Sequence, residues 1–186
     1  MARTVYYAAC TLDGYIAEPA EKLSWLTGFD GAGYAGEDGA GLPMRDAYPE
    51  FFASIGSIVM GSKTYEFMLG NEWPYGDLPV WVYTSRELPP IEDGRVEFLR
   101  GDVRERHPEM LEAAGDRDLW VLGGGELASQ YSDAGLLDLL TLTVTPIVLG
   151  EGIPLFAKPQ PKPMRLLSVR PFDNGMLELS YELITA

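Results

Sequence analysis

The hydrophobic residues in the first two thirds of the chain fall into short apolar runs separated by amphipathic stretches. The runs have the length of buried strands and lie at residues 4–10, 57–60, 80–84, 96–99 and 119–122. The stretches between them place apolar residues at helical spacing and predict helices from residue 46 to a stop at Gly56, at 62–69, at 108–114 and from about residue 126. This alternation is typical of an α/β protein with a parallel sheet.

The pattern changes after residue 139, where apolar and polar residues alternate with a period of two. Leu140, Leu142 and Val144 alternate with threonines, and the leucines of residues 177–183 alternate with glutamate and serine. This period is that of a strand with one exposed face, so we expect half-exposed antiparallel strands here. With the earlier elements they predict one mixed sheet with helices packed on it, in a single domain over residues 1–186.

Charge and composition exclude several classes of function. The 186 residues include 28 acidic and 14 basic side chains, and the net charge of -14 disfavours binding to nucleic acid or to an anionic membrane. The most apolar segment, residues 136–149, is interrupted by Asp138 and Pro146, and the N-terminus carries no signal pattern. We therefore expect a cytoplasmic protein.

Cysteine and histidine each occur once, as Cys10 and His107. A lone cysteine excludes an internal disulfide and multi-cysteine zinc patterns, and we expect no metal site. His107 lies in a polar run just before the predicted helix 108–114, which favours a solvated side chain over a catalytic one. Any chemistry must therefore use carboxylates, hydroxyls, backbone amides or a cofactor.

Residues 118–130 join a buried-type strand directly to a helix through Gly123, Gly124 and Gly125. Glycine lets the backbone approach a ligand that a Cβ atom would obstruct, and the start of a helix points free N–H groups at an anion. The spacing departs from G-x-G-x-x-G because Ala128 occupies the third glycine position. A phosphate site and a plain tight turn are both open from this motif alone.

The segment Gly61-Ser62-Lys63-Thr64 repeats this arrangement after the strand 57–60. Its ammonium and hydroxyl groups at a helix start suit phosphate, and an N-cap role for Ser62 or Thr64 is the alternative. Residues 56–64 also read G-x-x-x-x-G-S-K-T. Ser62 intrudes between glycine and lysine, and residues 57–60 form a strand, so a nucleoside-triphosphate loop is disfavoured.

A third strand end, Thr84-Ser85-Arg86, offers two hydroxyls and a guanidinium that suits bidentate contact with phosphate. A solvated surface arginine is the alternative. Ligands of open α/β sheets collect at the carboxyl ends of strands. Three such ends with anion-binding groups match a dinucleotide that carries a pyrophosphate and a ribose 2′-phosphate.

With these motifs in their order, the chain resembles the dihydrofolate reductase superfamily, and within it the reductase domain of the riboflavin-biosynthesis deaminase-reductase in stand-alone form. The resemblance runs nearly end to end and rests on residues 5–9, 12–17, 60–66, 73–76, 83–86, 121–126 and 145–156. It implies a dihydrofolate reductase-like, mainly parallel sheet of eight strands, with helices on both faces and antiparallel C-terminal strands.

The resemblance also implies NADPH as cofactor, with a cis peptide bond between Gly123 and Gly124. The pyrophosphate would lie at the two helix starts, the 2′-phosphate at residues 84–86 and the nicotinamide beside Ala9, Ile16 and Ala17. The family usually has arginine where Ser62 stands, so that charge is missing here. The implied cofactor-binding residues are Ala9, Asp13, Ile16, Ala17, Gly61, Ser62, Lys63, Thr64, Tyr83, Thr84, Ser85, Arg86, Leu122, Gly123, Gly124, Gly125, Glu126 and Leu127.

Two catalytic residues are implied by the same resemblance. An acidic residue on the first long helix contacts the pterin in folate-reducing relatives, and Asp46 is our candidate, with Glu50 the other nearby position. Thr143 matches a substrate-side threonine of the superfamily and would orient a carboxylate or a water molecule. The alternative roles are helix capping for Asp46 and turn capping for Asp13.

The leading hypothesis is an NADPH-dependent reductase, similar to 5-amino-6-(5-phosphoribosylamino)uracil reductase, that acts on a small heterocyclic or sugar-linked substrate. A non-catalytic nucleotide-binding module, acting as a sensor or sequestering its ligand, is the alternative. One histidine and one cysteine cannot build the zinc site of a deaminase. We expect a homodimer, because long alternating edge strands are usually covered. The glycine-rich segment 28–41 would be a lid or a plain surface loop.

Overall fold

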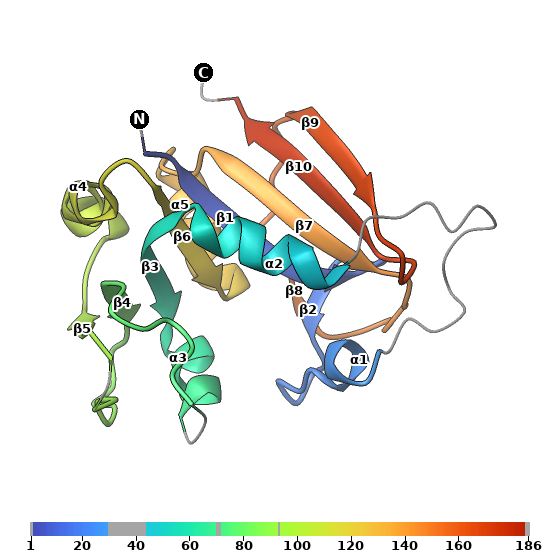
Figure 1. Cartoon of the computed structure of the whole chain (residues 1–186). Coiled ribbons are helices and arrows are strands. Elements are labelled where there is room, and N and C mark those ends of the chain that lie inside the picture. The colour runs from blue at the N-terminus through green and yellow to red at the C-terminus, as the bar shows by residue number, and fades with distance from the viewer. Residues whose placement is uncertain (1, 30–43, 70–71, 93, 185–186) are drawn as a thin grey trace.

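The computed structural model describes residues 2–29, 44–69, 72–92 and 94–184. Its main feature is an eight-stranded sheet in the order β5-β4-β3-β6-β1-β7-β10-β9 (Figure 1). The strands are β1 (Thr4–Thr11), β3 (Ile55–Gly61), β4 (Val80–Tyr83), β5 (Val96–Leu99), β6 (Asp118–Gly123), β7 (Leu139–Thr145), β9 (Met164–Pro171) and β10 (Leu177–Leu183). Two short strands, β2 (Tyr15–Ala17) and β8 (Ile153–Pro154), form a separate pair. The predicted lid or loop falls mostly on residues 30–41, outside the described residues.

The sheet is parallel from β5 to β7 and antiparallel where β10 pairs with β7 and β9. The predicted mixed, mainly parallel sheet is therefore confirmed. The expectation that β7 is half-exposed is wrong, because β7 lies between β1 and β10 and Thr143 and Thr145 are buried. Its threonine face lies beneath a helix rather than in solvent.

Helices cover both faces of the sheet, as expected. The apolar core on one face includes side chains of α2 (Met44–Ala53) and α3 (Ser62–Met68), and the core on the other includes those of α4 (Val103–Ala114) and α5 (Gly125–Asp133). Successive side chains of a strand point to opposite faces, so Tyr7 of β1 enters the first core and Tyr6 the second. A short helix, α1 (Ser24–Thr27), follows β2. Among the described residues, no helix is both long and apolar enough to cross a membrane.

Two helix boundaries differ from the predicted ones. The helix expected to run to Gly56 ends at Ala53, and Gly56 lies inside β3. A Cβ atom at Gly56 would stand 2.1 Å from the carbonyl oxygen of Ala114, so the glycine is needed for the close approach of β3 to the end of α4. The helix expected from Pro108 begins at Val103, where the Asp102 carboxylate accepts a hydrogen bond from the backbone N–H of Arg104 at 2.9 Å.

His107 is buried, which corrects the expectation of a solvated side chain. Because α4 begins earlier than predicted, His107 falls on the inward face of the helix with Val103, Met110 and Ala114. Its Nε2 atom shares a hydrogen bond of 2.7 Å with the hydroxyl of Thr4. The apolar spacing of residues 103, 107, 110 and 114 is the sequence signal that would have found this.

We expect acid to destabilise the protein through His107. Burial lowers its pKa, and the carboxylate of Asp138 offsets only part of that effect. Below the ordinary histidine pKa of about 6.5, the folded protein therefore binds fewer protons than the unfolded chain, and the free energy of unfolding falls as the pH drops. Replacing His107 by glutamine should flatten this dependence by up to about 1.4 kcal/mol per pH unit. Urea denaturation from about pH 7 to pH 5 measures the difference, and parallel curves for the two proteins would contradict it.

Candidate functional site

The two glycine junctions identified in the sequence lie side by side. They follow the neighbouring strands β3 and β6, and Met60 pairs with Gly123. Gly61 directly precedes α3 and Gly124 directly precedes α5. A Cβ atom at Gly61 would be 3.7 Å from the carbonyl oxygen of Gly123 and 3.8 Å from the nitrogen of Gly124. Two helix starts with free N–H groups therefore adjoin, which is an arrangement that suits a pyrophosphate.

No side chain caps either helix, so the alternative of Ser62 or Thr64 as a hydrogen-bonding N-cap is wrong. Ser62 and Thr64 are half-buried at the start of α3, and the Thr64 hydroxyl lies near Gly123. Glu126 and Leu127 form the first turn of α5, where Glu126 accepts a hydrogen bond of 3.4 Å from the side-chain amide of Gln130. The backbone donors at both helix starts are thus left without side-chain partners from their own caps.

The three consecutive glycines differ in what surrounds them. The bond between Gly123 and Gly124 is cis, as predicted, and Gly123 has a φ of 138°. A Cβ atom at Gly125 would lie 2.4 Å from the carbonyl oxygen of Pro154, so this glycine is required by the packing of α5 against β8. At Gly124 the nearest atom would be the Cδ1 atom of Ile16 at 3.9 Å. Gly124 therefore borders open space, and it faces one of the predicted nicotinamide residues.

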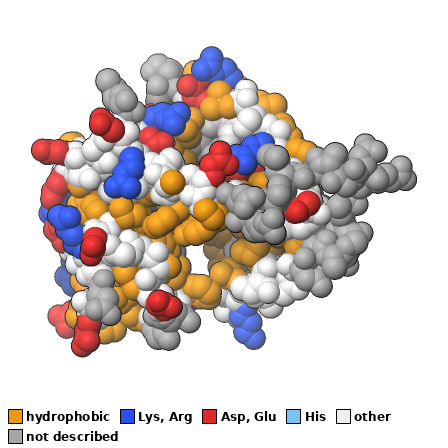
Figure 2. Space-filling view, viewed as in Figure 1, with side chains coloured by type: hydrophobic (Ala, Val, Ile, Leu, Met, Phe, Trp, Pro, Cys, Tyr) orange, Lys and Arg blue, Asp and Glu red, His pale blue; other side chains and the backbone are white. Residues whose placement is uncertain are grey.

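The centre of the sheet is exposed next to Gly124. β1 is an interior strand, yet Ala8 and Ala9 are only partly buried, as are Ile16 and Ala17 on β2. Figure 2 shows the surface hollowed between α3 and the segment of α1 and β2, with hydrophobic side chains around the opening. Interior strand positions are normally covered, so this opening is a cleft at the middle of the sheet with hydrophobic side chains around it.

The third predicted junction follows β4, which pairs with β3 so that Tyr83 lies beside Gly61. The Thr84 hydroxyl accepts a hydrogen bond of 3.0 Å from the backbone N–H of Arg86. Ser85 is exposed. The ring of Tyr83 packs into the core on the α4 and α5 side, so only its backbone is available at the strand end.

Both predicted phosphate-binding cations have carboxylate partners. Arg86 donates two hydrogen bonds to Glu66 of α3, at 2.8 and 2.6 Å, and Lys63 pairs with Glu21 at 3.1 Å. The hydrogen bonds from Arg86 lower the pKa of Glu66, so this carboxylate is charged at neutral pH. A 2′-phosphate at this strand end would have to compete with Glu66 for the guanidinium.

Asp13 links two loops through hydrogen bonds. Its carboxylate accepts hydrogen bonds from the Thr11 hydroxyl at 2.6 Å and from the backbone N–H groups of Leu149 and Gly150 at 3.2 and 2.7 Å. The hydrogen bond from Thr11, followed by those from the backbone, lowers the pKa of Asp13. These contacts support the turn-capping alternative, with Asp13 positioning the loop before β2.

The substrate-side candidates lie on the face that α2 covers. Thr143 is buried and its hydroxyl shares a hydrogen bond of 3.2 Å with the Tyr7 hydroxyl. Asp46 is in the first turn of α2, after the helix start at Met44, so its alternative role as N-cap is wrong; its side chain lies outside the described residues. Glu50 is exposed and pairs with Arg170 at 2.9 Å.

Comparison with known proteins identifies the family. Residues 73–177, more than half of the chain, match the RibD C-terminal domain. The chain belongs to the RibD C-terminal domain family. A relative, the uncharacterized protein YwjB of Bacillus subtilis, is 31% identical over 156 residues, which cover 83% of this chain and 82% of YwjB.

Solved structures agree with membership of the RibD C-terminal domain family. A putative riboflavin biosynthesis protein from Shewanella sp. PV-4 matches with a TM-score of 0.79 and 25% identity, and the match covers 100% of both chains. Dihydrofolate reductase from Enterococcus faecalis, solved in complex with NADP(H), matches with a TM-score of 0.61 and 18% identity over 97% of this chain and 94% of that chain. The predicted dihydrofolate reductase-like fold is confirmed.

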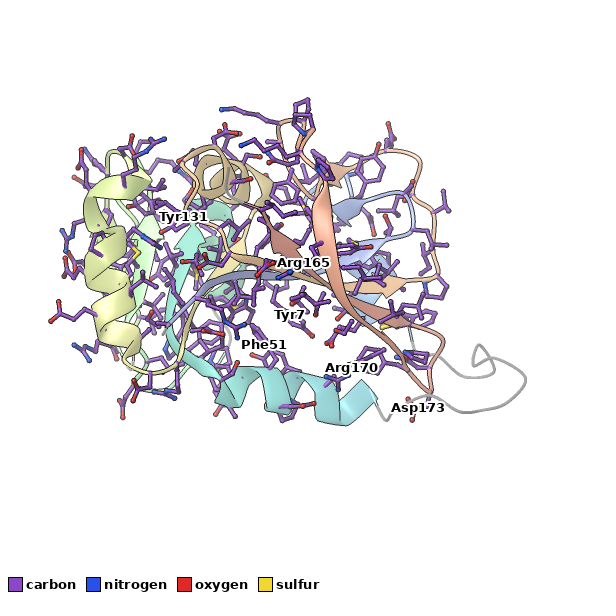
Figure 3. All side chains as sticks on the ribbon, turned by 90° about the horizontal axis from the view of Figure 1, so that it is seen from above. Tyr7, Phe51, Tyr131, Arg165, Arg170 and Asp173 are labelled. Carbon is purple, nitrogen blue, oxygen red and sulfur yellow. The ribbon has the colours of Figure 1, made fainter. Side chains whose placement is uncertain are left out.

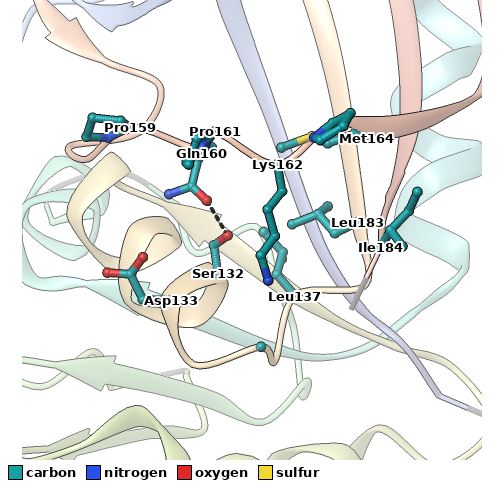
Figure 4. A pocket seen from close by; sticks show the side chains of 12 residues that line it. Ser132, Asp133, Leu137, Pro159, Gln160, Pro161, Lys162, Met164, Leu183 and Ile184 are labelled. Atoms are coloured by element: carbon teal, nitrogen blue, oxygen red, sulfur yellow. Dashed lines mark hydrogen bonds between the residues drawn. The ribbon is translucent and has the colours of Figure 1, made fainter. Parts of the chain in front are cut away.

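A separate pocket of about 250 Å³ lies at the C-terminal end of α5, where residues 159–164 pass over it (Figure 4). Ser132 at its rim donates a hydrogen bond of 2.5 Å to the side-chain oxygen of Gln160. None of the residues predicted for cofactor or catalysis lines this pocket. This pocket is therefore separate from the residues of this RibD C-terminal domain protein that are predicted to bind cofactor or substrate.

Proposed function

We propose that this protein is an NADPH-dependent reductase of the riboflavin-pathway type, which transfers hydride to a small heterocyclic or sugar-linked substrate such as 5-amino-6-(5-phosphoribosylamino)uracil. The observation that carries the proposal is the adjoining pair of helix starts at Gly61 and Gly124, open to the cleft where Ala9 is only partly buried. Membership of the RibD C-terminal domain family supports it, as does the fold shared with a dihydrofolate reductase solved with NADP(H).

The residues at the cleft fit this cofactor. NADPH bound there would supply the hydride. The backbone N–H groups at the starts of α3 and α5 would hold its pyrophosphate, and Gly124 leaves room that a side chain would fill. The short side chain of Ala9 and the apolar side chain of Ile16 would flank the nicotinamide and keep water from it.

The test combines binding and turnover. Tryptophan fluorescence is titrated with NADPH, and NADPH absorbance is then followed after adding 5-amino-6-(5-phosphoribosylamino)uracil. We expect saturable binding and substrate-dependent oxidation. Binding without oxidation of NADPH by this compound or related heterocycles would favour the non-catalytic nucleotide-binding module. Absence of binding would overturn both the reductase hypothesis and the binding-module hypothesis.

We expect the protein to be a homodimer that buries β9. This strand is at the edge of the sheet, and Leu166, Leu167 and Val169 are 52%, 48% and 51% exposed. An apolar edge strand of this kind invites pairing with another chain. Sedimentation should therefore give a dimer, and replacing Val169 by lysine should shift it toward monomer. A wild-type monomer at micromolar concentration would contradict this prediction.

A further inference from the structure

The carboxyl group of Glu178 is buried beneath α2. The alternation in residues 177–183 predicts leucines inside and glutamates outside, but at the start of β10 the order is reversed, with Leu177 38% exposed and Glu178 only 6% exposed. A glutamate in such a position requires hydrogen-bonding or charged partners, or a proton. Glu178 was not among the residues that the sequence indicated.

Glu178 belongs to a row of residues that leads across the sheet to the cleft. In the register of the strands, Arg170 of β9 pairs with Glu178, Glu178 with Thr143 of β7, and Thr143 with Ala9 of β1. Paired residues of adjacent strands project from the same face with neighbouring side chains. The row therefore runs from the buried carboxyl group, past a hydroxyl, to the strand position where the nicotinamide is proposed to lie.

The groups around Glu178 come from β9, α2, β1 and β7. Arg170 lies 3.3 Å from its carboxylate, and a second nitrogen of Arg170 donates to Glu50 of α2 at 2.9 Å. Tyr7 of β1 shares its hydroxyl hydrogen bond with Thr143 and stacks on Phe51 of α2. Figure 3 shows Tyr7, Phe51 and Arg170 in the space between α2 and the sheet.

These surroundings raise the pKa of the Glu178 carboxyl group. Burial raises its pKa, the charge of Arg170 offsets part of this effect, and the carboxylate of Glu50 adds to it. Because Arg170 is shared with Glu50, it neutralises Glu178 incompletely. The pKa of Tyr7 is also raised, mainly by burial, so that hydroxyl keeps its proton at neutral pH and can donate it to Thr143.

A second hydroxyl on the same face has no partner. Thr145 lies two residues beyond Thr143 on β7, so its side chain projects from the same face of the sheet. It is 0% exposed, and its Oγ1 atom has no hydrogen-bond partner within the described part of the chain. An unpaired buried hydroxyl is costly unless another molecule fills its place. This face of the sheet therefore carries a second buried hydroxyl close to Thr143 in the sequence.

We propose that Glu178 supplies, through the hydroxyl of Thr143, the proton that the substrate takes up when it is reduced. The inference rests on the proposed reductase function. The C=N or C=O carbon of the substrate takes hydride from the reduced cofactor, its nitrogen or oxygen takes a proton from Thr143, and Thr143 is reprotonated by Glu178. NADPH would supply the hydride and its electron pair and would thereby be oxidised to NADP, and the Glu178 carboxylate recovers its proton from water. Glu178, rather than an acidic residue on α2, is then the source of this proton.

The decisive variant is Glu178→Gln, which keeps the size and polarity of the side chain but removes its acid. We expect kcat with NADPH and 5-amino-6-(5-phosphoribosylamino)uracil to fall by about 100-fold, in the range of general-acid effects, with KM and NADPH affinity little changed. Wild-type kcat should fall as the pH rises through the pKa of Glu178, and the variant should lack this limb. Glu182→Gln is the matched control, because Glu182 lies on the same strand and also pairs with an arginine, Arg165, but its side chain is 38% exposed.

A readout without cofactor or substrate accompanies the kinetics. Carboxyl carbon NMR of glutamate-labelled protein, with Glu178→Gln to assign the signal, should give a Glu178 pKa above the ordinary value of about 4.3 that coincides with the kinetic one. Thr143→Val should lower kcat as Glu178→Gln does, without further loss in the double variant, and Thr143→Ser should restore it. The two single Thr143 variants also apply if Glu178→Gln fails to fold.

The outcomes separate this inference from the proposed function. An active wild-type enzyme with undiminished Glu178→Gln turnover, or a Glu178 that is ionised throughout the active pH range, overturns the inference alone. A wild-type protein that binds NADPH but does not oxidise it with any substrate of this class overturns the proposed reductase function, and the inference falls with it.

Discussion

Replacing Gly124 by alanine is expected to weaken NADPH binding by about 100-fold while the protein stays folded. The added methyl group would meet only the Cδ1 atom of Ile16 at 3.9 Å, an ordinary contact, and the backbone at Gly124 is extended. The same methyl group would enter the space proposed for the pyrophosphate, next to the start of α3. Losing two charge-assisted hydrogen bonds there would cost about 3 kcal/mol, or about 100-fold in affinity. Fluorescence titration and thermal melting measure the two effects.

The neighbouring glycine provides the control. At Gly125 a Cβ atom would stand 2.4 Å from the carbonyl oxygen of Pro154 and 2.9 Å from that of Leu155. Gly125→Ala should therefore lower the melting temperature, because α5 must move away from the backbone around β8. Unchanged NADPH affinity in Gly124→Ala, in a folded protein, would remove the main support for a cofactor site at these helix starts.

The wild-type protein is expected to prefer NADPH over NADH, and Arg86→Ala is expected to erase that preference. The 2′-phosphate distinguishes the two cofactors, and Arg86 is the arginine at the end of β4 proposed to contact it. Its guanidinium is exposed to solvent, so we expect a preference of about tenfold rather than more. Parallel titrations with both cofactors measure it. Equal affinity of wild type for NADPH and NADH would show that this strand end is wrongly assigned.

Glu66 provides a further test of the proposed contact between Arg86 and the 2′-phosphate. Its carboxylate occupies both arms of the guanidinium, at 2.8 and 2.6 Å, and would repel an incoming phosphate. Glu66→Gln should therefore strengthen NADPH binding and leave NADH binding unchanged. Glu97→Gln is a suitable control, because Glu97 also pairs with an arginine, Arg106 at 2.8 Å, but on β5. A similar gain in both variants would point to overall charge rather than to the contact at Arg86.

Local patterns were sufficient for most of the elements and for the glycine junctions, whereas α1, β8 and β9 were not predicted. The apolar runs that predict β1, β3, β4 and β6 depend on neighbouring residues in the sequence, and so do the helices that start after Gly61 and Gly124. The requirement for glycine at a strand-to-helix junction is also local, because it concerns a few bonds of backbone. The fold class followed from the order of these elements together with the family resemblance.

The contacts that a side chain makes across the sheet could not be predicted from local patterns. The sequence pattern predicts exposed side chains for His107 and Glu178, yet each is buried by an element far away in the chain. It likewise predicts unpaired cations at Arg86 and Lys63, which form ion pairs with Glu66 and Glu21. These outcomes depend on strand order and on which face α2 covers.

The sequence by itself therefore determined where most strands and helices and the glycine junctions between them lie, because those follow from periodicity and from glycine conformation over a few residues. Only the tertiary structure decided that the junctions at Gly61 and Gly124 adjoin and that Thr143 and Glu178 form a buried polar row. Burial and hydrogen bonding act between residues more than one hundred positions apart, such as Tyr7 and Thr143, and no local pattern records them.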